Sequence, residues 1–256
     1  MNKFILYNSP EYTILKEHFE TLPMMDTYIA NLIESYIYDT VREYYNDGSI
    51  YREYRTKYGI KDGEFKQWFP TGELAIQAWF VNGKFEGEYN EWTSNGNMLR
   101  QITYVDGKMN GYYKSYNVYG ELSVQSTFLN GVKEGVMTRY YGKNRPDVSE
   151  SYKAGKLHGE RKSYHQNGWL LNVRNFVDGV ENGEEIWYHR EGKIKSKCNI
   201  VNGKKEGEYL EWSFHDDYIT VRAYYVNDKL HGKYTKYLRD GTVYEECEYV
   251  NGVVKV

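Results

Sequence analysis

The chain has 256 residues, a formal net charge of −3 and 27% charged residues. This balance argues against a nucleic-acid binder, and no apolar run approaches the roughly 20 residues of a membrane-spanning helix. The 29 Tyr, 24 Gly and only 4 Pro favour strands joined by tight turns and argue against disorder. The N-terminus lacks the apolar length of a signal peptide, so we expect an intracellular, cytoplasmic protein that is not secreted.

Residues 1–39 do not share the pattern of the rest of the chain, and they predict a short helical segment. Ser9-Pro10 is a typical helix start, and Asp26 begins a second stretch with apolar residues at helical spacing. One interpretation is a cap that covers the open edge of the first hairpin, because exposed edges invite aggregation. The other is a docking segment, since Leu22-Pro23 followed by an Ile/Leu-rich helix resembles the start of a degenerate F-box.

From residue 40 to residue 256 a 24-residue unit recurs. Each unit contains an Asn-Gly or similar turn, and further glycines recur four and thirteen residues after it. Asn-Gly is the strongest short hairpin signal, because both residues tolerate positive φ, whereas glycine at this frequency excludes long helices. The turn glycines are Gly83, Gly107, Gly131, Gly155, Gly179, Gly203 and Gly252, with Asp228 in the remaining slot. The sequence therefore predicts a β-hairpin array.

Two aromatic columns run through the units. Aromatic rings on consecutive hairpins can stack and bury one another, which a single hairpin cannot achieve. The second column contains Phe80, Tyr104, Phe128, Tyr152, Phe176, Ile200, Tyr225 and Tyr249. The first column is the candidate interaction surface, because Tyr and Trp are good interface anchors; it contains Trp68, Trp92, Tyr116, Tyr140, Tyr164, Tyr188, Trp212 and Tyr237.

The second strand of each unit alternates with a period of two residues, which predicts a sheet with one packed and one wetter face. In the unit near residue 80 the two predicted sets are Leu74, Ile76, Ala78 and Phe80 against Ala75, Gln77, Trp79 and Val81.

Polar residues interrupt the more apolar face. Glu150 and Arg174 stand in the column of Ala78, and Arg100 stands in the column of Ile76. They form either cross-strand ion pairs, each contributing up to about 1 kcal/mol, or polar contacts within a binding groove. A single-layer sheet cannot bury both faces, so the apolar one must twist closed, dimerise or bind something. Arg100 and Arg174 are therefore added to the candidate interaction surface.

No motif for catalysis or cofactor binding stands out, and we expect neither an enzyme nor a cofactor. His158 and His231 share a turn column and are interpreted as polar turn residues rather than metal ligands. Cys198 and Cys247 are two repeats apart, about 19 Å at roughly 4.8 Å per strand, which is beyond the reach of a disulfide. We expect reduced core cysteines and no metal site.

The units resemble MORN repeats, in particular the variant form with a Tyr/Trp-x-x-x-Gly-x-Leu segment. The resemblance rests on segments such as 87–96 and 104–111, and it covers about residues 40–256. It implies a mainly β fold: an elongated, single-layer antiparallel sheet of stacked 24-residue β-hairpin repeats, here with a short helical N-terminal cap. Variant repeats of this kind occur in large DNA viruses and in bacterial proteins associated with toxin–antitoxin systems, and family roles include scaffolding, dimerisation and lipid association.

Three functional hypotheses follow. The first is a non-enzymatic protein-interaction or structural scaffold, with a protein partner or self-association, including a virion or assembly component of a large virus. The second is an adaptor that recruits machinery through the F-box-like segment. The third is a membrane-surface, lipid-binding adaptor, which the negative charge and the lack of a large basic patch disfavour.

Overall fold

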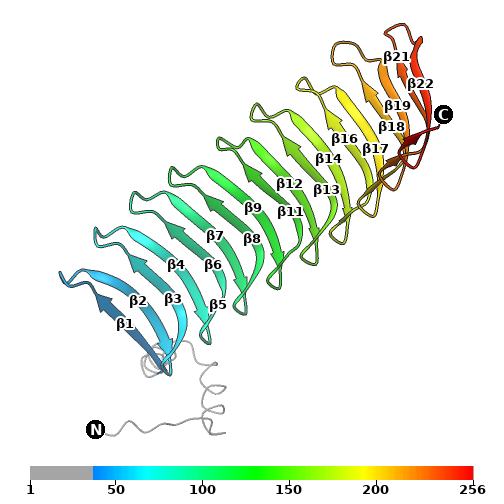
Figure 1. Cartoon of the computed structure of the whole chain (residues 1–256). Coiled ribbons are helices and arrows are strands. Elements are labelled where there is room, and N and C mark those ends of the chain that lie inside the picture. The colour runs from blue at the N-terminus through cyan, green and yellow to red at the C-terminus, as the bar shows by residue number, and fades with distance from the viewer. Residues whose placement is uncertain (1–36, 256) are drawn as a thin grey trace, which may run out of the picture.

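The computed structural model describes residues 37–255 of the chain. The helical cap or docking segment predicted for residues 1–39 lies outside the described residues, except for its last three. Tyr38 and Asp39 are the first residues of the first strand, so the hairpin array begins immediately where the described part of the chain begins (Figure 1).

The described residues form strands throughout. The first part of the array contains β1 (Tyr38–Tyr44), β2 (Ile50–Lys57), β3 (Ile60–Trp68), β4 (Leu74–Val81), β5 (Lys84–Phe85), β6 (Gly87–Trp92), β7 (Met98–Val105), β8 (Lys108–Tyr116), β9 (Leu122–Leu129), β10 (Val132–Lys133) and β11 (Gly135–Tyr140). The second part contains β12 (Pro146–Lys153), β13 (Lys156–Tyr164), β14 (Leu170–Val177), β15 (Val180–Glu181), β16 (Gly183–Tyr188), β17 (Ile194–Val201), β18 (Lys204–Trp212), β19 (Ile219–Val226), β20 (Lys229–Leu230), β21 (Gly232–Tyr237), β22 (Val243–Val250) and β23 (Val253–Val254).

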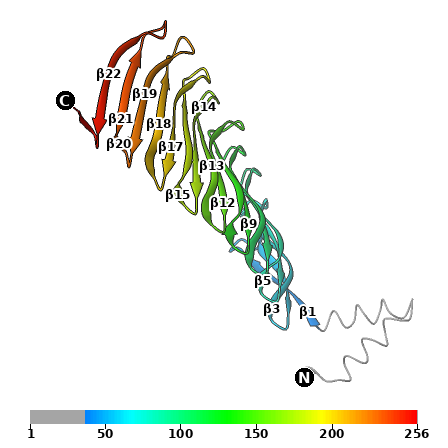
Figure 2. The ribbon, with the colours of Figure 1, turned by 90° about the vertical axis from the view of Figure 1, so that its right-hand side faces the viewer.

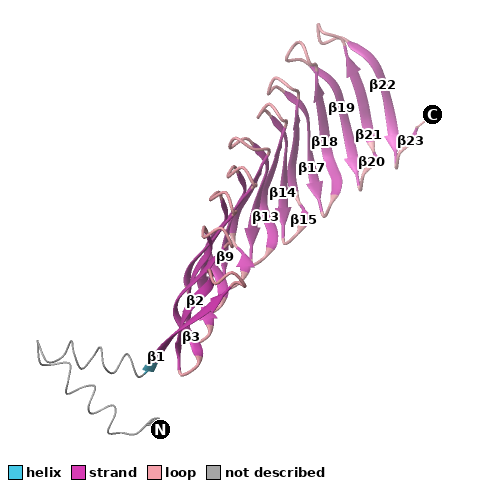
Figure 3. Ribbon diagram, turned by 90° about the vertical axis from the view of Figure 1, so that its left-hand side faces the viewer, coloured by secondary structure: helices cyan, strands magenta, loops and turns pink. Residues whose placement is uncertain are grey.

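Within residues 37–255 these 23 strands form one antiparallel sheet, in which hairpins follow one another in chain order. Figure 1 shows a single elongated layer with turns along both long edges. The sheet also twists along its length, so that Figures 2 and 3 show the C-terminal strands nearly face-on and the N-terminal ones crowded edge-on. The twist is the right-handed strand twist accumulated over many neighbours. The predicted single-layer hairpin array is confirmed.

The Asn-Gly turns form as predicted, and each is tied to the turn before it. Asn82 and Gly83 have φ values of 48° and 81°, the left-handed geometry of a two-residue hairpin turn. The Gly83 N–H donates to the Lys61 carbonyl of the preceding turn at 2.7 Å. Equivalent bonds link the later turns, for example from Gly107 to Phe85 at 2.9 Å. The turns on this edge therefore stack through backbone hydrogen bonds as well as through side chains.

The opposite edge is closed by a longer turn. In the first full example, the Phe69 N–H donates to the Glu73 carbonyl at 2.8 Å, and the Gly72 N–H donates back to Phe69 at 2.9 Å. Gly72 has a φ of 93°. This is a three-residue hairpin loop with glycine in the position that needs positive φ.

The glycine column four residues after the Asn-Gly turns lies inside the strands rather than in turns. In the pairing of β17 with β18, Cys198 faces Tyr209 while the next residue, Asn199, faces Glu206. Two residues, Gly207 and Glu208, are therefore extra on β18 and form a bulge that is one residue longer than the common kind. The same shift recurs between other strands in this register. The bulge explains why a column of glycine is needed where a regular strand would not need one.

A second irregularity changes the predicted alternation. Gln67 faces Ile76, but the next residue, Trp68, faces Leu74, so Ala75 is an extra residue on β4. The predicted alternation, in which Leu74 belongs to the same series as Ile76 and Phe80, is therefore interrupted at this bulge. The alternation holds for the rest of the strand, where Phe65 faces Ala78.

The face that carries Phe65, Ala78 and Phe80, called the aromatic face, packs upon itself. These three side chains are buried, with Phe65 and Phe80 each 7% exposed. Ring centroids lie 5.8 Å apart for Phe65 and Phe80, and 4.4 Å apart for Phe80 and Phe85. The strong curvature of the strands in Figure 1 accompanies this burial in a single layer. The aromatic face of the first repeats therefore buries part of its own apolar surface within an open sheet.

Candidate interaction surfaces

The aromatic face is divided along its length. A continuous run of ring contacts extends from Tyr54 through Phe65, Phe80 and Phe85 to Tyr104. Further along, the columns of Phe65 and Phe80 give isolated ring pairs with centroids 5.8–5.9 Å apart: Tyr113–Phe128, Tyr209–Tyr225 and Tyr234–Tyr249. Between Phe128 and Tyr209 the described part of this face has no ring pair. Charged and polar side chains occupy that interval.

This interval, called the central band, contains two cross-strand ion pairs. Arg161 Nε donates to Glu150 Oε1 at 2.9 Å, and Arg174 Nη1 lies 3.6 Å from Glu181 Oε2. The sequence placed Glu150 and Arg174 in one column, but each finds its partner on a neighbouring strand. The prediction of cross-strand ion pairs on this face thus holds with different partners.

The protonation of the two carboxyls is set by different environments. Burial alone would raise the pKa of Glu150, but hydrogen bonds from Tyr152 and Arg161 outweigh it and leave the pKa below its usual range. Burial raises the pKa of Glu181, and Arg174 offsets this only in part. The pKa of Tyr152 is raised to about 12 by burial and by its bond to Glu150. Glu150 therefore stays ionised, while Glu181 is the more easily protonated group.

Three buried polar atoms in the central band have no hydrogen-bond partner within residues 37–255. They are Asn172 Oδ1, Arg174 Nε and Glu181 Oε1. Asn172 is only 3% exposed. An unsatisfied buried polar atom costs about 1–3 kcal/mol, so this arrangement is suited to an additional group that brings both donors and acceptors.

The aromatic column predicted as an interaction surface lies elsewhere. Trp68, Trp92 and their equivalents stand at the ends of strands, next to the three-residue turns, where the second bulge occurs. All eight side chains are half-buried. They take no part in the ring contacts of the aromatic face, although the Trp68 carbonyl accepts a bond from the Tyr45 hydroxyl at 2.8 Å.

Arg100 is exposed on the aromatic face and pairs with Glu91 at 3.1 Å, well before the central band. The structure therefore does not bring Arg100 and Arg174 together.

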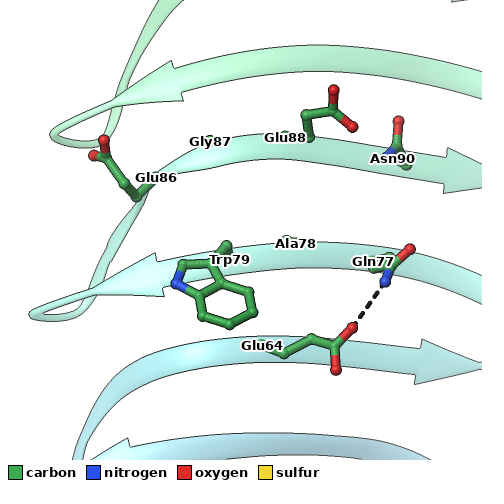
Figure 4. Close-up of a pocket in the computed structure, with 8 residues that line it drawn as sticks. All are labelled: Glu64, Gln77, Ala78, Trp79, Glu86, Gly87, Glu88 and Asn90. Carbon is green, nitrogen blue, oxygen red and sulfur yellow. Dashed lines mark hydrogen bonds between the residues drawn. The ribbon is translucent and has the colours of Figure 1, made fainter.

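The other face, which carries Gln77 and Trp79 and is called the polar face, has a shallow pocket of about 410 Å³. Figure 4 shows Trp79, 47% exposed, beside carboxylates from two neighbouring strands. Glu64 accepts a hydrogen bond from Gln77 at 2.8 Å, whereas Glu86 and Glu88 have no cationic partner among the described residues. Such a combination of an aromatic ring and carboxylates suits a cationic side chain.

An equivalent pocket of about 310 Å³ lies five repeats further along the chain. It is lined by Glu184, Glu206 and Glu208, which are equivalent to Glu64, Glu86 and Glu88. Asn199 replaces Trp79, and Lys197 pairs with Glu184. Both pockets occur where the two extra residues of the first bulge open the sheet. The pockets were not predicted, because the sequence does not reveal the bulge that creates them.

No group of three or more His, Cys, Asp or Glu in residues 37–255 is arranged to hold a metal ion. No helix in this part of the chain combines the length and the apolar character needed to cross a bilayer. Cys198 is buried and Cys247 half-buried, and neither forms a disulfide.

The comparisons with known proteins agree with the geometry of the hairpins. The family described as the MORN repeat variant matches residues 61–82, 85–106, 157–178, 181–202 and 230–251. The unmatched stretches between these segments fold into the same hairpins, for example β9 with β11 and β18 with β19. No curated protein matches the chain.

Proposed function

Since the chain belongs to the MORN repeat variant family, we propose that it is a non-enzymatic scaffold whose twisted repeat sheet holds a protein partner. Repeats of this family generally provide surfaces for protein or membrane interaction. A virion or assembly component of a large virus, one of the settings in which repeats of this kind occur, forms part of this proposal.

The observation that carries the proposal is the central band of the aromatic face. A polypeptide partner would contact the accessible parts of the Arg174 and Glu181 side chains, which are 28% and 20% exposed. By shifting these side chains it would pair their atoms that have no hydrogen-bond partner in the free chain. Satisfying buried groups in this way contributes to affinity and specificity, because a competitor without the matching groups leaves them unpaired.

The proposal is tested by affinity capture of the full-length chain from its native cell or particle, with Arg174→Gln and Arg100→Gln compared with wild type. Both arginines lie on the aromatic face, but only Arg174 belongs to the central band. We expect quantitative mass spectrometry to show one partner in stoichiometric amount, at least tenfold depleted by R174Q and unchanged by R100Q. Equal retention by both variants would remove the central band from the proposal, and the absence of any stoichiometric protein would remove the scaffold function itself.

A further inference from the structure

An exposed aliphatic row runs along the edge of the sheet that carries the Asn-Gly turns, the edge where β5 lies in Figure 1. Seven long strands end in an aliphatic residue, with exposed fractions between 37% and 51%. We call this row the aliphatic rim; its members are Val81, Val105, Leu129, Val177, Val201, Val226 and Val250. Among the long strands that end at this edge, only β2 and β12 end differently, each in a lysine.

The strand conformation does not require aliphatic residues at these positions. Two residues earlier on the same strands and the same face, the column of Trp79 is mostly polar: Thr103, Thr127, Ser151, Asn175, Asn199, Tyr224 and Glu248. Threonine satisfies the preference of strands for β-branched residues as well as valine does, yet no rim position has it. A single exposed valine needs no explanation, whereas a regular row of them along a whole edge indicates a binding surface.

The residues paired with the rim give it a border of lysines and valines, with lysine opposite four rim members and valine opposite the other three. Across the turns, Val105 pairs with Lys108 and Val201 with Lys204. Of these lysines, Lys84 forms a salt bridge with Asp106. The other three, Lys108, Lys204 and Lys229, are exposed and have no salt-bridge partner within the described chain. The partner that complements the rim is therefore apolar opposite the rim residues and their paired valines, and acidic opposite the lysines.

The spacing of the rim matches that of an α-helix. Consecutive rim residues are two strands apart, which is about 9.6 Å along the sheet. Seven residues of an α-helix advance about 10.5 Å, so one residue per heptad can contact one rim residue. The four consecutive members from Val177 to Val250 would take about 20 helical residues.

The twist of the sheet favours a helix over a lipid bilayer. The turn edge follows the twist seen in Figures 2 and 3, so a flat bilayer would touch only part of the rim. A helix with a seven-residue apolar repeat can instead coil along its partner.

We propose that the aliphatic rim binds an acidic amphipathic α-helix whose apolar residues recur every seven positions. This deepens the proposed scaffold function and rests on it, but it concerns the turn edge and not the central band. At the gap in the rim, Lys153 pairs with Lys156, and an acidic residue of the helix would replace the apolar one there.

The test uses the full-length chain and fluorescently labelled synthetic peptides of four heptads. One peptide carries leucine at one position per heptad with glutamate on either side of it, and its control has the same composition with leucine at irregular spacing. The rim variant combines Val177→Thr, Val201→Thr, Val226→Thr and Val250→Thr, which retain shape and strand preference. Its matched control combines Asn175→Thr and Asn199→Thr on the same strands and face.

Fluorescence anisotropy should show that the heptad peptide binds to wild type and to the matched control. Its affinity for the rim variant should be at least tenfold lower. The peptide with irregular leucine spacing should not bind. Circular dichroism must show equal melting temperatures for the two variants; if the rim variant melts lower, the single changes V201T and V226T are compared instead. Absence of heptad-peptide binding, or equal binding by the rim variant, overturns the proposal. Rim-dependent binding to phosphatidylserine-containing vesicles without peptide binding also overturns it and assigns the rim to a bilayer. If the partner captured by wild type depends on Arg174 but not on the rim, the scaffold function stands and this inference falls.

Discussion

Glu150 and Glu181 occupy the same central band but respond to burial in opposite ways. Glu150 accepts hydrogen bonds from Tyr152 and Arg161 at 2.8 and 2.9 Å, and these favour its charged form. Glu181 has one ion-pair contact at 3.6 Å and one unsatisfied oxygen, so burial dominates. The number and length of the bonds to each carboxylate decide the direction of its pKa shift.

The two shifts predict opposite pH dependence for two conservative substitutions. The pKa of Glu181 is raised above 4.5 in the folded chain, so folding becomes less favourable as pH rises through this range. The pKa of Glu150 is lowered below 4.5, so its stabilisation is present above that value and lost as pH falls. Between pH 4 and pH 7, E181Q should gain stability relative to wild type and E150Q should lose it. Urea unfolding at the two pH values measures both differences, and a change of the same sign for both variants would contradict this interpretation.

Glycine at the first bulge is required both by backbone geometry and by space. Gly183 has a φ of 116°, and a Cβ built there would lie 3.1 Å from the Asn175 Cβ. Gly168, in a three-residue turn, has a φ of 90° and nothing within 4 Å. We expect G168A to cost about 1–3 kcal/mol from backbone strain alone, and G183A to cost more because Asn175 must also move. Chemical denaturation of both variants measures the difference; equal losses would show that the close approach contributes nothing.

At the scale of the hairpin, the residue three positions after the turn glycine connects successive turns in several repeats. Glu86 Oε2 accepts a bond from the Asp106 N–H at 2.8 Å, and Glu134 Oε2 accepts one from the Ala154 N–H at 2.7 Å. His231 Nδ1 lies 3.4 Å from the Asn251 N–H in the same arrangement. His231 therefore contributes to the stacking of turns, whereas His158, the other histidine of this column, lies within β13 with its Nδ1 3.4 Å from Asp178 Oδ1.

This connection predicts a local effect of removing one carboxylate. Glu134→Ala should destabilise the chain by about 1 kcal/mol and accelerate hydrogen exchange at the Ala154 amide, which loses its acceptor. Asn110→Ala, in the same column without a hydrogen bond to the next turn among the described residues, is the matched control and should leave the next turn unchanged. If the Ala154 amide exchanges at the same rate in E134A and wild type, the carboxylate does not protect it.

The sequence was sufficient for the hairpins but not for the bulges between them. Asn82-Gly83 and its equivalents require positive φ, and this local requirement fixes the turns and the 24-residue period. The bulges at Gly207 and Ala75 depend on which residues face each other across two strands, which no local preference determines. The ion-pair partners in the central band and the pockets of the polar face follow from that register, and they were therefore missed.

At the scale of the whole molecule, the array has contacts only between neighbours. Such an array unfolds by local opening, because each repeat is stabilised by the next. The ring contacts that join the first repeats do not continue through the central band, where ion pairs with small net energies replace them. The N-terminal and C-terminal parts of the array should therefore open separately.

Phe80→Ala and Ile200→Ala test this independence, because both residues occupy the same column and are buried, five repeats apart. Each truncation should cost about 2–5 kcal/mol where it occurs. Native-state hydrogen exchange of F80A should be faster in β3 to β7 and unchanged in β17 to β22, since Phe80 packs only on Phe65, Phe85 and their neighbours. I200A should show the reverse distribution. If hydrogen exchange were accelerated uniformly along the chain in either variant, the array would unfold as one cooperative unit. The central band would then couple its neighbouring repeats as strongly as the ring contacts couple the first repeats.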